Sequence, residues 1–124
     1  MKPDVEKHLR VADETLREME HLLAGGFHRG VVGRAYYAML CAATAALTAK
    51  EIEKGSRQAI VPTFADAFVK TGLLDKKFHS YFRQAFGART ESDYPSFASA
   101  DHRQAQTTRV RTKEFIAACR RLCE

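Results

Sequence analysis

The chain has 124 residues, 45% hydrophobic and 28% charged, with a net charge of +5. This composition predicts one soluble domain over residues 1–124 that buries its own core. Three cysteines, an odd number, argue against a disulfide framework and for a reducing cytoplasm. Acids outnumber bases in residues 1–24 and bases outnumber acids in residues 99–124. This asymmetry suits either a polyanionic partner or two copies of the chain meeting.

The first predicted helix extends from Asp4, its expected N-cap, to Ala24. Gly25 and Gly26 end it, as glycines do after helices. Its apolar residues recur at spacings of four and three, which predicts one apolar stripe on an otherwise charged helix. They are Val5, Leu9, Ala12, Leu16, Met19 and Leu23.

The second predicted helix follows a short link at residues 27–29 and runs to about Lys50. Its central run, Gly33–Leu47, is rich in alanine and has one charged residue, Arg34. A helix that is apolar on nearly all sides is typical of the middle of a bundle. The run is too short and too alanine-rich to span a bilayer comfortably, and no signal peptide opens the chain. We therefore expect a cytoplasmic protein without a membrane segment.

The third predicted helix starts at Ser56 as N-cap, or nearer Val61 because Pro62 favours a first turn, and Gly72 closes it. A charged surface loop at residues 51–55 precedes it.

Asp75 is the expected cap of a fourth helix, which ends by Tyr94 because Pro95 disfavours helical geometry before it. Its apolar stripe continues onto Arg89 and Asp93, which are spaced so that they can pair. One interpretation is an ion pair that ends the helix. The other is an arginine held for a phosphate group, with the carboxylate orienting it.

A fifth helix begins after Ser99 or Asp101 and runs to the C-terminus. Its expected inward positions are Ala105, Thr108, Thr112, Phe115, Ile116, Cys119 and Leu122. No strand-like alternation is visible. The predicted fold is therefore all-α, an up-and-down helical bundle of four main helices plus a shorter additional helix.

One polar stripe interrupts the apolar surface of the second helix: Arg34, Tyr37, Cys41, Thr44 and Thr48. Such a stripe is usual in a core whose hydroxyls are satisfied by neighbours, and it can also line a groove or a dimer seam. For metals the sequence offers only Cys119 and Cys123, one helical turn apart, and nothing near them completes a ligand set. We expect no metal and no cofactor.

Four segments, in this order and spacing, resemble the small bacterial and archaeal HEPN-domain proteins. They are Arg34–Met39 with Ala42-Ala43, Phe64 with Phe68–Leu73, Arg89 with Ser92-Asp93-Tyr94, and Phe115–Ala117. The resemblance implies a helical bundle that commonly forms a homodimer. It also implies a minimal nucleotidyltransferase as partner, often in a toxin–antitoxin pair, and nucleotide or RNA as ligand.

Many members of that family are metal-independent ribonucleases that use an arginine followed, after four to six residues, by a histidine. No arginine and histidine of this chain have that separation. Tyr94 stands where the histidine would follow Arg89, and Cys41 stands where relatives often carry a histidine. An unperturbed tyrosine titrates near pH 10, so it is a poor base at neutral pH.

Three hypotheses follow. The first is a nucleotide- or RNA-phosphate-binding or partner-docking module that uses Arg34, Tyr37 and Arg89. The second is a divergent metal-independent ribonuclease with Arg89, Asp93 and Tyr94 as catalytic candidates. Its proton would be moved by Tyr94 or by a histidine brought near in space, His79 or His102. The third is a purely structural dimeric interaction protein.

Overall fold

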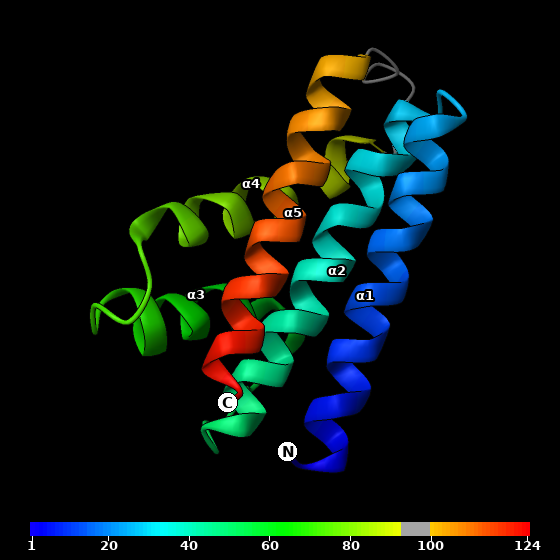
Figure 1. The fold of residues 1–124 in the computed structure, drawn as a ribbon. Helices are drawn as coiled ribbons and strands as arrows, with labels where there is room; N and C mark the ends of the chain where they lie inside the picture. The colour runs from blue at the N-terminus through cyan, green and yellow to red at the C-terminus, as the bar shows by residue number, and fades with distance from the viewer. Residues whose placement is uncertain (93–99) are drawn as a thin grey trace.

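The computed structural model describes residues 1–92 and 100–124, including their side chains except those of residues 90–92. The described part contains five α-helices and no strand, which confirms the all-α prediction (Figure 1). Four of them are long and one is short: α1 (Pro3–Ala24), α2 (His28–Ala49), α3 (Ile60–Phe64), α4 (Lys76–Ser92) and α5 (His102–Leu122).

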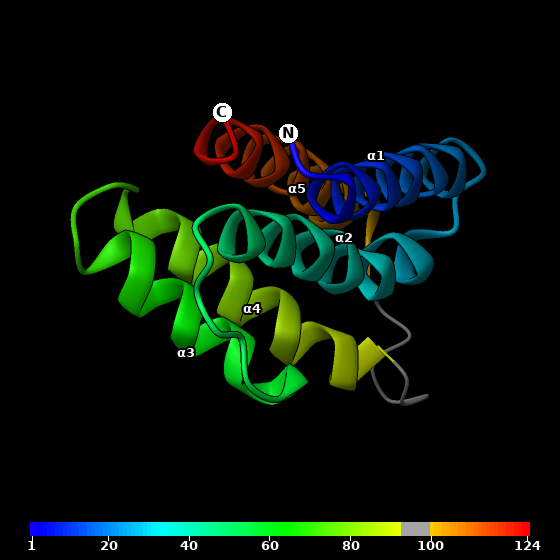
Figure 2. The ribbon, with the colours of Figure 1, turned by 90° about the horizontal axis from the view of Figure 1, so that it is seen from below.

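Helix α2 occupies the centre of the bundle. Seen from below, it lies between a layer formed by α1 and α5 and a layer formed by α3 and α4 (Figure 2). It runs antiparallel to α1, and both chain ends lie at the same end of the bundle (Figure 1). By length and composition α2 could cross a membrane, but 72% of its most apolar window is buried inside the bundle. Its role as the core helix accounts for its apolar sequence.

Two kinds of packing hold the other helices against α2. Small side chains allow close approach, and the alanines from Ala35 to Ala46 that face neighbours are fully buried. On the side of α3, α4 and α5 an aromatic cluster fills the core. Phe115 is its centre, with ring centroids 5.2 Å from Phe64 and 5.2 Å from Phe82. Ring pairs at this separation add to the free energy gained by burial.

The helix ends follow the predicted caps in two cases. The carboxylate of Asp75 accepts a hydrogen bond from the Lys77 amide at 2.8 Å, and that of Asp101 accepts one from the Gln104 amide at 2.8 Å. Asp101, and not Ser99, is therefore the N-cap of α5. These bonds satisfy amides that a helix start otherwise leaves without partners.

The predicted start of the first helix was wrong, and of the two predicted starts of the third helix one was wrong. Helix α1 begins at Pro3, one residue before Asp4, and has no side-chain cap. Proline suits the first helical position because it has no N–H to satisfy, so Asp4 falls inside the first turn, where its charge still favours the helix. For the third helix, the alternative start near Val61 is confirmed to within one residue, because α3 starts at Ile60. Ser56 instead precedes a 3₁₀ turn (Arg57–Ala59), and its side chain makes no capping hydrogen bond.

Helix α3 is shorter than predicted because its continuation, Ala65–Val69, is a π-helical turn. The amide of Lys70 donates to the carbonyl of Ala65, five residues back, at 2.9 Å. The wide turn keeps both Phe64 and Phe68 in the core, with their ring centroids 5.3 Å apart. Gly72, with φ of 81°, then ends the segment as predicted.

Candidate functional site

The two adjacent tyrosines of α2 have different surroundings because neighbouring residues of a helix point about 100° apart. Tyr36 is 2% exposed and packs on α4, with its ring centroid 6.0 Å from that of Phe82 and 5.3 Å from that of Phe86. Tyr37 is half-buried and lies one turn before Cys41 on the polar stripe. Tyr36 is therefore a core residue, while Tyr37 reaches the surface.

Arg89 lies at the outer edge of the α4 aromatic face. Its guanidinium carbon is 5.0 Å from the ring centroid of Tyr36 and 5.5 Å from that of Phe86. A cation at this distance is attracted to the face of an aromatic ring, which orients the side chain. Asp93 and Tyr94, the other catalytic candidates, lie outside the described residues, so the ion pair between Arg89 and Asp93 stays a prediction.

Arg34 is half-buried near the start of α2. One of its terminal nitrogens is 3.2 Å from a carboxylate oxygen of Glu18 on α1, and its guanidinium lies 5.1 Å from the ring centroid of Tyr37. Its Nε is buried and has no hydrogen-bond partner among the described residues. The ion pair and the ring fix the plane of this guanidinium.

Arg57, in the 3₁₀ turn before α3, is a third arginine at this place, and sequence analysis missed it. Burial raises the pKa of Tyr36 and of Cys41, and the interaction with Cys41 raises the pKa of Tyr37. The charge of Arg57 lowers all three pKa values, so it stands within electrostatic range of the three groups. No periodic pattern indicated Arg57, because tertiary packing brings its irregular segment to α2.

These residues lie around α2, and we call the group the arginine–tyrosine face although Tyr36 and Cys41 are buried beneath it: Arg34, Tyr36, Tyr37, Cys41, Arg57 and Arg89. The structure brings Arg34 to Tyr37 and Arg89 to Tyr36, and Arg57 acts on both tyrosines. The three cations come from α2, from the turn before α3 and from α4.

The face carries positive charge and neutral proton donors at neutral pH. The pKa values of both tyrosine hydroxyls lie above their ordinary 10.0, and that of the Cys41 thiol lies above 9.0. For Tyr36 and Cys41 burial, and for Tyr37 chiefly the interaction with Cys41, disfavours the ionised form more strongly than the arginines favour it. These three groups therefore donate hydrogen bonds at neutral pH and do not act as bases.

The two histidine candidates lie at different places. His79 precedes Arg89 by ten residues on α4, which corresponds to about 15 Å along a helix axis, too far for both to contact one phosphate group. His102, at the start of α5, packs on His28 of α2 with ring centroids 5.4 Å apart. Across the described residues, no three histidine, cysteine or acidic side chains gather as a potential metal site.

The chain is similar in sequence to several small archaeal and bacterial proteins. A protein of Methanocaldococcus jannaschii named "Putative toxin" is 30% identical over 105 residues, which cover 85% of this chain and 71% of that protein. A UPF0332 protein of Thermotoga maritima is 26% identical over 120 residues, 97% of this chain and 91% of that protein. A second UPF0332 protein, from Pyrococcus horikoshii, is 33% identical over 78 residues, 63% of this chain and 55% of that protein.

The family comparison covers nearly the whole chain, since residues 5–122 match the HEPN domain. This range includes all five helices except the first two residues of α1. The helical bundle, the double tyrosine and Arg89 thus stand in a recognised domain, and the chain belongs to the HEPN domain family.

Proposed function

We propose that this HEPN-type module binds the phosphate groups of single-stranded RNA on its arginine–tyrosine face and works beside a minimal nucleotidyltransferase in a toxin–antitoxin pair. The observation that carries the proposal is that Arg34 lies over the ring of Tyr37 and Arg89 over the ring of Tyr36, with Arg57 within electrostatic range of both tyrosines. Two relatives bear the name "Putative toxin", which supports the toxin context.

The chemistry of the face suits phosphate. Arg34 and Arg89 each lie against a tyrosine ring, so their planar guanidinium groups are oriented before a ligand arrives. An oriented guanidinium can donate two parallel N–H bonds to phosphate oxygens, and little side-chain entropy is then lost on binding. The half-buried ring of Tyr37 adds a surface on which an unstacked base can pack.

Binding fits the residues better than cleavage does. The arginine–histidine spacing of the family's nucleases is absent from the chain, and the hydroxyls of Tyr36 and Tyr37 hold their protons at neutral pH. A phosphate bound here would meet cations and hydrogen-bond donors. Stable binding of RNA, without turnover, is the expected outcome.

The test is fluorescence anisotropy with a labelled single-stranded RNA, comparing wild type with Arg57→Gln and Arg89→Gln. Each substitution removes one charged hydrogen-bonding group, so we expect the affinity to fall about tenfold. Arg83→Gln is the matched control, because Arg83 is an exposed arginine of α4 six residues before Arg89, about 120° away around the helix. An equal loss of RNA affinity in Arg83→Gln would show that only net charge matters, and it would contradict the proposal.

The same samples, run on a denaturing gel without added metal, separate binding from catalysis. Intact RNA with wild type is the expected result. Cleavage by wild type that Arg89→Gln abolishes would replace the binding role by the ribonuclease hypothesis.

A homodimer is part of the proposal, and light scattering should give twice the 13.9 kDa of one chain. A monomer at micromolar concentration would contradict the proposed homodimer.

Co-expression with a candidate nucleotidyltransferase should yield a complex that co-purifies with the wild-type chain. Its failure to form would count against the partner while leaving RNA binding standing.

A further inference from the structure

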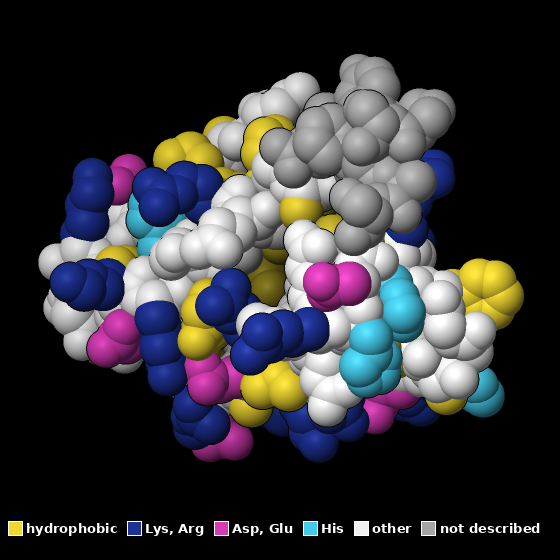
Figure 3. All heavy atoms as spheres, turned by 90° about the horizontal axis from the view of Figure 1, so that it is seen from above, with side chains coloured by type: hydrophobic (Ala, Val, Ile, Leu, Met, Phe, Trp, Pro, Cys, Tyr) yellow, Lys and Arg dark blue, Asp and Glu magenta, His cyan; other side chains and the backbone are white. Residues whose placement is uncertain are grey.

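A cleft of about 470 Å³ opens between α2, α4 and α5, beside the arginine–tyrosine face but lined by other residues. The described residues around it are Val32, Met39, Tyr81, Gln84, Ala85, Ala88, Asp101, Arg103, Gln104, Thr107, Thr108 and Arg111. Seen from above, Figure 3 shows a hollow with hydrophobic side chains at its bottom and basic side chains beside it. This volume is typical of sites for small molecules.

The floor of the cleft is apolar and its rim is polar. Val32 and Met39 of α2 and Ala85 of α4 form the floor and are at most 7% exposed. Gln84 and Gln104 stand at the rim with two threonines of α5. A concave apolar surface with a few convergent polar groups favours a ligand with an apolar body and one polar end.

Arg111 supplies the charge that selects this polar end. Its guanidinium lies over the ring of Tyr81, 5.0 Å from the centroid, and its Nη1 donates to Oε1 of Gln84 at 3.3 Å. The ring and the amide hold the cation at the cleft without neutralising it. Arg111 forms no ion pair with any described residue.

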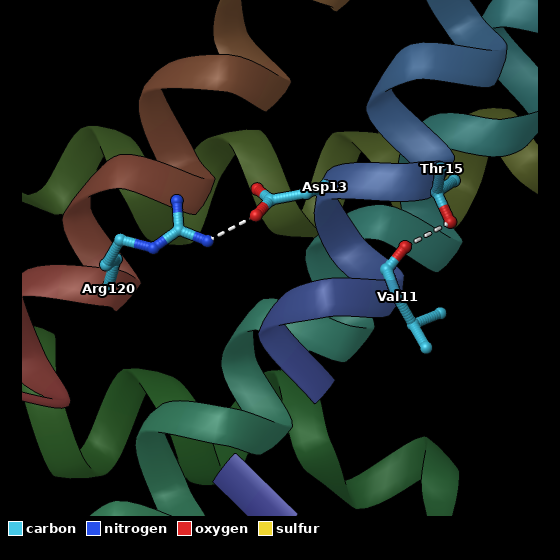
Figure 4. A network of polar contacts seen from close by, with 4 residues as sticks. All are labelled: Val11, Asp13, Thr15 and Arg120. Carbon is cyan, nitrogen blue, oxygen red and sulfur yellow. Dashed lines mark hydrogen bonds and ion pairs between the residues drawn. The ribbon is translucent and has the colours of Figure 1, made fainter. Parts of the chain in front are cut away.

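The other half-buried arginines of α5 are different. Arg109 pairs with Glu20 at 2.9 Å, and Arg120 pairs with Asp13, both carboxylates coming from α1 (Figure 4). Such a pair compensates a cation for the part of its hydration that is lost on partial burial. Arg111 is thus the one half-buried arginine of α5 whose counter-charge is not supplied by the described residues, and it borders a cavity.

A second cation, Arg103, lines the cleft eight residues earlier, about 12 Å away along the helix axis. Among the described lining residues Asp101 is the one acid, and its carboxylate accepts a hydrogen bond from the Gln104 amide. These described residues therefore carry a net charge of +1, from two arginines and one aspartate. This balance favours a ligand with one negative charge.

We propose that the cleft between α2, α4 and α5 binds a small organic anion with a ring-sized apolar body and a single anionic group that Arg111 receives. The apolar body displaces water from Val32, Met39 and Ala85, and the anionic group accepts hydrogen bonds from Arg111. Carboxylate and sulfonate share this chemistry, and a phosphate monoester offers similar oxygens with a charge of about −2 at neutral pH. The site does not depend on RNA binding, because its lining residues differ from those of the arginine–tyrosine face.

Two fluorescent probes test the site. 8-Anilinonaphthalene-1-sulfonate has the required body and anion, and N-phenyl-1-naphthylamine has the same body without the anion. We expect saturable one-to-one binding of the sulfonate by the folded wild type. Arg111→Met should weaken the sulfonate about tenfold or more and change the neutral probe by less than about twofold. Ala88→Phe, which fills the cleft, should weaken both probes.

Arg121→Met is the matched control, since it removes the same charge from an exposed position of α5 outside the lining. It should leave both probes unchanged. Near-UV circular dichroism shows whether the core of each variant keeps its native packing, since a loosened core could itself bind the probes. If Arg111→Met loses the wild-type spectrum, Arg111→Lys replaces it. Lysine keeps the charge without the planar fork, so a loss of sulfonate affinity of several-fold is then expected.

Competition by 1-naphthoate and by 1-naphthyl phosphate identifies the preferred anion. Displacement of the sulfonate probe by either compound supports the site. The stronger competitor shows whether the site prefers a carboxylate or a phosphate. Equal sulfonate affinity in wild type and Arg111→Met would overturn the proposal. Displacement of the bound probe by single-stranded RNA at its own binding concentration would also overturn it, because the cleft would then be part of the RNA surface.

Discussion

The proton of Tyr36 links the burial of a single residue to the stability of the protein. Burial raises the pKa of this hydroxyl above 10.0, against the opposing charges of Arg89 and Arg57. The folded protein therefore holds the proton more tightly than the unfolded chain does. When the pH rises past the unfolded value, the unfolded state loses its proton first, and the free energy of unfolding falls.

We predict that Tyr36→Phe flattens the alkaline part of the stability profile. Well below pH 10.0 the tyrosine is protonated in both states, so its contribution is constant there. Above it, the wild type should lose stability more steeply than the variant as the pH approaches the folded pKa. Urea unfolding followed by circular dichroism between neutral pH and the alkaline range measures this difference. Parallel profiles for the two proteins would contradict it.

Residue by residue, the candidate face was predictable where the residues share a helix or a motif. The polar stripe of α2 placed Arg34 next to Tyr37, and helical spacing put Arg89 on an apolar face. Arg57 escaped because it lies in a 3₁₀ turn whose position depends on the packing of α3. Arg111 was not predicted for a different reason: its position at the cleft is set by contacts with Tyr81 and Gln84, which lie on another helix.

Helices α1 and α5 are joined by contacts that contribute very different amounts to stability. The side chains of Asp13 and Arg120 point toward each other across the two helices, while Thr15 donates to the carbonyl of Val11 within α1 at 2.8 Å (Figure 4). The side chains of Arg120 and Asp13 are 41% and 37% exposed, so water screens their pairing. The apolar core contributes far more to holding α5.

We predict that two truncations on α5 differ several-fold in cost. Phe115→Ala removes a fully buried ring and should lower the free energy of unfolding by about 3–5 kcal/mol. Arg120→Ala should lower it by about 1 kcal/mol or less. Urea denaturation of both variants gives the comparison. A double-mutant cycle with Asp13→Ala isolates the ion pair, and a coupling energy well above about 1 kcal/mol would show that the pair is shielded from water.

The existence and order of the elements were predictable because apolar spacing and caps are local. Every long helix was expected within a few residues of its observed bounds. The errors fell where local signals compete: Pro3 against Asp4 as the start of α1, and a π-helical turn where a regular α-helix was predicted. A π turn depends on how Phe64 and Phe68 fit the core, which no single segment encodes.

For the whole molecule, the uneven charge of the two chain ends has an explanation inside the protein. Sequence analysis offered a polyanionic partner or a second copy. The structure shows that acids of α1 pair with bases of α5 in the same chain, through Glu20 with Arg109 and Asp13 with Arg120. Part of the charge difference between the two chain ends is therefore neutralised by ion pairs within the bundle. Arg34 is likewise paired within the chain, with Glu18 of α1 at 3.2 Å.

We predict a modest salt dependence of RNA binding. If Arg34, Arg57 and Arg89 each neutralise one phosphate, the logarithm of the association constant should fall with the logarithm of salt concentration with a slope of about −2 for a single strand. Arg57→Gln should reduce the magnitude of the slope by about 0.7. Anisotropy titrations between about 50 and about 200 mM salt measure it. A slope unchanged in Arg57→Gln would remove this residue from the binding surface.

The buried alanines of α2 also limit which substitutions this protein can accept during evolution. Six of them between Ala35 and Ala46 have no exposed surface, so any larger side chain would have to displace a neighbouring helix. Variation along this stretch is limited by volume more than by polarity. The half-buried positions Tyr37, Thr44 and Thr48 are free of that limit. Descendants of this chain can therefore diversify what the central helix presents at its surface while inheriting the bundle unchanged.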